Sequence, residues 1–155
     1  MSQWLPIVVN ASHLIGRHPR FARLVVVRFE LDRRPPARWV DLFNRVDSRQ
    51  FARPDAPTPR LLDGLVQVDA RDDALDEDVA GVLLHIEAAN RWYEEDLRGV
   101  TPKPLADLAG AARLQEAHAR AARLTRDFGR ARPTGAGPQS PAFRFVPGTP
   151  SEREF

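Results

Sequence analysis

The sequence predicts an α+β fold, a two-layer sandwich in which helices cover a small three-stranded sheet and a long C-terminal helix leads into an extended tail. Three observations predict it. Apolar side chains alternate along residues 24–31, as they do in a half-buried strand. They recur every three or four residues from Leu75 to about Arg98, and again over residues 104–128, as in amphipathic helices. Pro and Gly residues separate these segments.

The length and composition bound the possible functions. The chain has 155 residues and no cysteine, which excludes disulfide scaffolds, thiolate zinc sites and cysteine nucleophiles. Residues 1–128 are expected to form a single domain, and a chain of this size buries about 70% of its unfolded surface without a metal or disulfide. No apolar run is long enough to span a membrane, and residues 4–9 lack the features of a secretory leader. We therefore expect a soluble, cytoplasmic protein without a cofactor.

Charge is distributed unevenly along the chain. The formal net charge is +2, but residues 61–99 hold eleven acids and three arginines, a local balance of −8 against +10 elsewhere. Such a chain can bind nucleic acid, or its two halves can pair within a monomer or across a dimer. We favour pairing, because no stretch reaches the run of five or six like charges that is typical of a solvated tail.

Three strands are expected, at residues 5–9, 24–31 and 65–69, with a polar loop between the first two and a turn at Asp63-Gly64. If the strands at 24–31 and 65–69 are parallel neighbours, the helix between them is a right-handed crossover. That order looks partly ferredoxin-like, although no motif supports it. So small a sheet has exposed edges, which a partner chain or the tail could cover.

The first two helices each have an apolar stripe that is expected to face the core. The first opens at Pro35-Pro36 and buries Trp39, Leu42, Phe43 and Val46. The second begins after an acidic cluster whose expected role is to compensate the helix dipole rather than to bind a metal. Its stripe consists of Leu75, Val79, Val82, Leu83, Ile86, Tyr93 and Leu97. Asn90 lies inside this stripe, so its amide needs a backbone partner or lies at the mouth of a site.

A second stripe on the same helix is the first predicted protein-binding surface. Its small residues would let another helix approach closely, and Trp92 is of the type that anchors interfaces. The stripe consists of Gly81, Leu84, His85, Ala88 and Trp92.

The last helix has two faces of interest. Its apolar seam, suited to packing on another helix, consists of Leu114, Ala117, Ala121, Leu124 and Phe128. Four arginines lie on the far side and could contact nucleic-acid phosphates, the acidic helix or solvent: Arg120, Arg123, Arg126 and Arg130.

Catalytic chemistry has little support in the sequence. His13 and His18 share the predicted polar loop with Ser12, Arg17 and Arg20, but two histidines are too few for a zinc site. No known nucleotide-binding, hydrolase or metalloprotease motif occurs. A spatial arrangement of Ser12, a histidine and an acid stays open, because such triads do not depend on sequence order.

Residues 129–155 are rich in Pro and Gly, a composition that cannot build a core. Residues 142–146 form an apolar island within this tail, and Phe143 and Phe145 make it a candidate docking segment for a sheet edge. Together these features predict a non-catalytic protein that binds other polypeptides as an assembly or adaptor component and is itself homo-oligomeric. The alternative is a nucleic-acid-binding module that uses the arginines of the last helix.

Overall fold

The computed structural model describes residues 4–47, 57–101, 110–126 and 128. Within them lie four strands, three α-helices and a single turn of 3-10 helix, η2 (Asp72–Ala74). The strands are β1 (Val9–Arg17), β2 (Leu24–Leu31), β3 (Arg60–Leu62) and β4 (Leu65–Arg71), and the helices are α1 (Ala37–Arg45), α2 (Leu75–Leu97) and α3 (Ala111–Thr125). The predicted α+β class is confirmed.

The sheet has the order β1-β2-β4-β3, and all of its neighbouring strands are antiparallel. The predicted three-stranded sheet and its ferredoxin-like order are therefore wrong. The reason lies in the hairpin of β3 and β4, whose turn residues Asp63 and Gly64 have φ angles of 50° and 80°. A two-residue turn with both φ angles positive joins antiparallel strands, and β4 then returns beside β2 in the opposite direction.

The first strand lies later in the chain than the sequence predicts. Strand β1 covers most of the segment that was expected to be a polar loop, whereas residues 5–8 are not part of the sheet. The pairing of β1 with β2 shifts register between Val9 and Ala11 and again between Leu14 and Gly16. Each shift inserts an extra residue into β1, which interrupts the alternation of apolar and polar side chains by which a strand is recognised.

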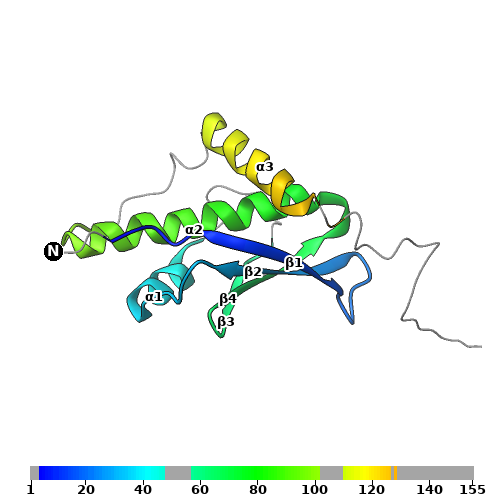
Figure 1. Ribbon diagram of the computed structural model, residues 1–155, viewed down its shortest axis with the longest axis horizontal. Helices are drawn as coiled ribbons and strands as arrows, with labels where there is room; N and C mark the ends of the chain where they lie inside the picture. Colours follow the sequence, from blue (N-terminus) through cyan, green and yellow to red (C-terminus); the bar gives the residue numbers. More distant parts are fainter. Residues whose placement is uncertain (1–3, 48–56, 102–109, 127, 129–155) are drawn as a thin grey trace, which may run out of the picture.

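The core lies between one face of the sheet and the helices. Val27, Phe29, Val66 and Val68 are completely buried on the sheet side. Figure 1 shows α2 running along the sheet, α3 crossing α2 beside β1, and α1 near the far end of α2. The predicted stripe of α1 is confirmed as buried.

The predicted stripe of α2 is buried over most of its length. Tyr93 is half-buried and its ring centroid lies 4.8 Å from that of Trp4. Leu97, which was expected in the core, is 55% exposed. It occupies the last turn of α2, where the helix extends past the sheet (Figure 1).

Helix α3 packs on α2 through its predicted seam. Ala117, Ala121 and Phe128 are buried, and Leu114 and Leu124 are partly buried against the same core. The two helices run in opposite directions, because Thr125 Oγ1 donates to Asp76 Oδ1 at 2.7 Å while Arg113 forms an ion pair with Glu87. The predicted first turns of this helix, at 104–109, fall outside the described residues.

The expected pairing of the acidic segment with the rest of the chain is confirmed within one molecule. Arg17 contacts Asp72 at 3.4 Å, and Arg38 contacts Asp96 at 3.0 Å. The Arg113–Glu87 ion pair joins α3 to α2 in the same way. Among the described residues, no helix is both long and apolar enough to cross a membrane.

Candidate protein-binding face

The sheet has a second face that points away from the helices, here called the outer face. Antiparallel partners share a face, so the register defines its members. The register puts on the outer face Ala11, His13 and Gly16 from β1, Leu24, Val26, Arg28 and Glu30 from β2, Arg60 and Leu62 from β3, and Leu65, Gln67, Asp69 and Arg71 from β4. Ile15, in the second bulge of β1, lines the same hollow as His13 and Arg28. None of these side chains is buried by the described part of the chain.

One row of donors crosses all four strands of the outer face. His13 lies opposite Arg28, Arg28 lies opposite Gln67, and Gln67 lies opposite Arg60. Arg28 Nη2 donates to Gln67 Oε1 at 3.1 Å, and no ion pair to Arg28 is found within the described residues. This half-buried guanidinium therefore has a neutral partner, which leaves its charge available to a ligand.

Two carboxylates flank this row. Glu30 Oε2 lies 2.5 Å from His13 Nε2, and Asp69 Oδ2 lies 3.4 Å from Arg60 Nη2. His18, just beyond the end of β1, brings its Nε2 to 3.8 Å from Asp69 Oδ2. Acidic and basic groups thus alternate across the outer face, so it presents both signs of charge to a partner.

Exposed apolar side chains lie at two margins of the outer face. Ile15 on β1 is 50% exposed and Leu62 on β3 is 45% exposed. Val26 and Leu65 lie between them and are half-buried. Single exposed apolar residues are common on protein surfaces, but these lie on the same sheet face as a donor row and are not covered by any described helix.

The outer face is hollowed between the C-terminal end of β2 and the turn that joins β3 to β4, beside His13 and Ile15 of β1. This hollow has a volume of about 540 Å³, and the cationic groups on its walls are His13, Arg28, Arg33 and Arg34. Glu30 and Asp63 contribute the negative charges. A carboxylate that entered the hollow would meet guanidinium groups, the donors that bind carboxylates in a bidentate geometry.

The structure separates the residues of the predicted polar loop. Ser12 lies on the inner face, opposite Phe29, and its Oγ donates to the carbonyl of Leu124 at 2.8 Å. His13 lies on the outer face, so Ser12 and His13 point to opposite sides of β1 and do not form a nucleophile–base pair. No group of three His, Asp or Glu side chains within the described ranges converges on a possible metal position.

The predicted protein-binding flank of α2 is largely covered by the chain itself. Leu84, His85 and Ala88 are at most 2% exposed, and Gly81 and Trp92 are half-buried. The ring of His85 packs 4.4 Å from that of Phe43, and its Nε2 lies 2.9 Å from the Phe43 carbonyl. The small residues did predict a close helix contact, but the approaching helix is α1 of the same molecule.

The described arginines of the predicted arc on α3 differ in exposure. Arg123 and Arg126 are exposed, whereas Arg120 is half-buried and lines a groove beside residues 6–9. Glu116 is also exposed on this helix. Arg130, Phe143 and Phe145 lie outside the described residues.

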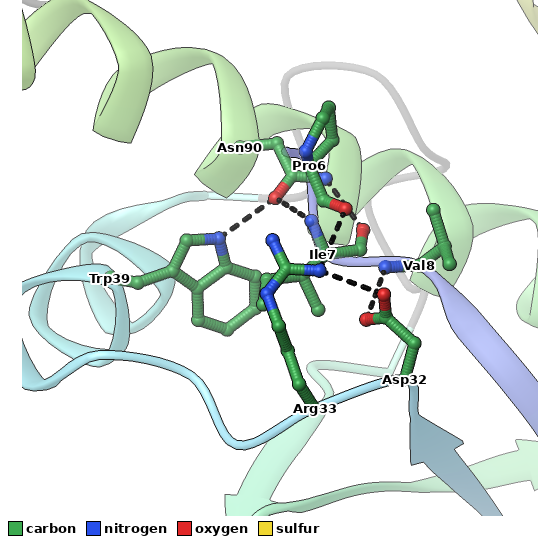
Figure 2. A network of polar contacts seen from close by, with 7 residues as sticks. All are labelled: Pro6, Ile7, Val8, Asp32, Arg33, Trp39 and Asn90. Carbon is green, nitrogen blue, oxygen red and sulfur yellow. Dashed lines mark hydrogen bonds and ion pairs between the residues drawn. The ribbon is translucent and has the colours of Figure 1, made fainter. Parts of the chain in front are cut away.

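Asn90 fulfils the expectation of a polar partner inside the stripe of α2. Its Oδ1 accepts from the Ile7 amide at 3.0 Å and from Trp39 Nε1 at 2.9 Å, and its Nδ2 donates to the Ile7 carbonyl at 2.8 Å (Figure 2). Asp32 Oδ1 accepts a hydrogen bond from the Val8 amide at 3.1 Å. These side chains hold the N-terminal segment against α2, so Asn90 has a structural role.

Comparison of the chain with protein-family models, curated proteins and solved structures finds no match.

Proposed function

We propose that this chain is a non-catalytic protein that binds another polypeptide through the outer face of its sheet. The observation that supports the proposal is the exposure of Ile15 and Leu62 on a face that also carries a row of donors and a hollow with three arginines on its walls. Protein interfaces combine apolar with polar contacts, and arginine is enriched in them.

The faces of the sheet support binding better than its edges do. The two bulges of β1 break the regular ladder that an added strand would need. The other edge strand, β3, has only three residues. Short or bulged edge strands are common devices against edge-to-edge pairing, and this favours the outer face over the edges as the proposed binding surface.

A photoreactive phenylalanine analogue at position 62 tests this proposal in the native cell. Illumination should join the chain to another polypeptide, visible as a heavier band whose mass identifies the partner. The matched control places the analogue at position 123, which is exposed on α3 in the helical layer. Adducts of equal yield from both positions, or none from position 62, would contradict binding at the outer face.

A further inference from the structure

We infer that the polypeptide bound at the outer face is a second copy of this chain, packed sheet against sheet about a two-fold axis. The inference rests on the proposed function and adds the identity of the partner. Three properties of the outer face support it: its charges are self-complementary, its area approaches that of a small specific interface, and the short or bulged edge strands oppose the addition of further strands.

The charges of β2 are arranged so that a two-fold axis can pair them. Arg28 and Glu30 are two residues apart and point to the same face, which places their Cα atoms about 7 Å apart. An axis that crosses the strands between them brings Glu30 over Arg28 of the partner subunit. The same operation forms the reciprocal pair, because a two-fold interface makes each contact twice.

Arg28 is suited to this contact because its partner inside the chain is the neutral Gln67. A carboxylate from the second copy would provide the opposite charge and two acceptor oxygens for the guanidinium. The hollow beside Arg28 has room for such a side chain, and Arg34 lies on its wall. Glu30 can take part, since it is on the exposed surface beside His13.

The area of the outer face agrees with a specific interface. Four strands spaced about 4.8 Å apart and roughly seven residues long cover about 450 Å² in projection. Two such faces bury about 900 Å² when the sheets are treated as flat, and protruding side chains add to this area. The value approaches the lower limit of about 1,000 Å² for a specific interface. Ile15 and Leu62 would lose their exposed apolar surface in this contact.

A pair of complementary charge reversals tests the inference. We expect the wild-type chain to have twice its monomer mass of 17.4 kDa by light scattering. In the Arg28→Glu dimer, two glutamates would face each other at both contacts, and in the Glu30→Arg dimer two arginines would do so. The dissociation constant of each variant dimer should therefore rise more than about tenfold. Mixing the two variants restores both ion pairs and should restore the dimer mass.

Two further variants keep the test interpretable. Leu62→Glu changes an exposed position at the margin of the face and should also yield monomers, which covers the case in which a β2 variant does not fold. Arg123→Glu reverses a charge on the helical layer and should leave the wild-type mass unchanged. Circular dichroism checks that each variant retains its secondary structure.

A wild-type chain that is monomeric over the accessible concentrations would overturn the inference, and so would a mixture that stays monomeric after both single variants dissociate. If the monomer still forms adducts of another mass from position 62, binding at the outer face stands and only the second copy is wrong. If it forms no adducts, both proposals fail.

Discussion

At the scale of single residues, Asn90 pairs with the backbone of Ile7 as a neighbouring strand would. One amide side chain binds both the N–H and the C=O of Ile7 and also the indole of Trp39 (Figure 2). Ile7 is 1% exposed and Trp39 is completely buried, so the groups that bond to Asn90 have little contact with solvent. A leucine at this position would fit the stripe of α2 but would leave three polar groups without partners.

We therefore expect Asn90→Ala to lower the free energy of unfolding by about 3 kcal/mol, because unsatisfied buried groups cost about 1–3 kcal/mol each. Urea unfolding followed by circular dichroism measures the change. Glu94→Ala, at an exposed position on the same helix, is the control and should stay within about 0.5 kcal/mol of wild type. Equal stabilities of the two variants would contradict the role assigned to Asn90.

His85 is the second residue with a measurable consequence. Its burial between α2 and α1 lowers its pKa from 6.5 to about 4, because the charged ring would lose its solvation. Its Nε2 contacts the Phe43 carbonyl, and its Nδ1 has no partner within the described residues. The folded protein thus holds this imidazole in its neutral form at neutral pH.

The sign of the pH effect follows from this difference. The unfolded chain takes up a proton on His85 near pH 6.5 and the folded chain only near pH 4, so its contribution to stability is complete above pH 6.5 and is lost as the pH falls toward 4. The loss amounts to about 3 kcal/mol, at 1.36 kcal/mol for each pH unit.

Replacing His85 with a side chain that does not titrate tests this account. Between pH 7 and pH 4, the free energy of unfolding should fall by about 3 kcal/mol less in His85→Gln than in wild type. His118→Gln removes an exposed histidine and should follow the wild-type curve. Parallel curves for wild type and His85→Gln would show that His85 does not couple folding to pH.

At the scale of elements, the turn at Asp63-Gly64 positions β3 and with it one margin of the outer face. Both residues have positive φ, and no atom lies within 4 Å of a Cβ placed on Gly64. The space is open, so a substitution there costs only backbone strain. Leu62, immediately before the turn, depends on it for its place beside Leu65.

Gly64→Ala should therefore lower the free energy of unfolding by about 1 kcal/mol, the usual cost of placing an L-residue in the left-handed region. Asp63→Asn should change it by less than about 0.5 kcal/mol, because asparagine tolerates positive φ. Thermal unfolding compares the two variants. A larger loss from Asp63→Asn than from Gly64→Ala would contradict this account of the turn.

The elements also show which sequence patterns were sufficient. Helices α1 and α2 were predicted because their apolar residues repeat without interruption, and the strand at β2 because its alternation is regular. Strand β1 was missed because its two bulges break the alternation of apolar and polar side chains. Strand β3 has three residues, too few to show any period.

At the scale of the whole molecule, the prediction of internal charge pairing is confirmed, whereas the flank of α2 that was predicted to bind proteins is largely covered by the chain itself. The stripe of Leu84, His85 and Ala88 has the composition of a protein interface. In the structure it forms an internal contact, in which α2 packs against α1. Sequence alone could not distinguish an internal helix partner from an external one. The outer face was not predicted, because its members are far apart in sequence and meet only through the register of four strands.

All three tryptophans and the single tyrosine gather around one turn of α2. Trp92 and Tyr93 belong to the helix, the Trp4 ring packs at a tilt against that of Tyr93, and Trp39 donates a hydrogen bond to Asn90. Intrinsic fluorescence therefore observes the end of the molecule where the N-terminal segment lies on α2. The outer face has no tryptophan or tyrosine of its own. The Arg33 guanidinium on the wall of the hollow nevertheless lies 5.8 Å from the centroid of the Trp4 ring, so a ligand that moves Arg33 would change this optical signal.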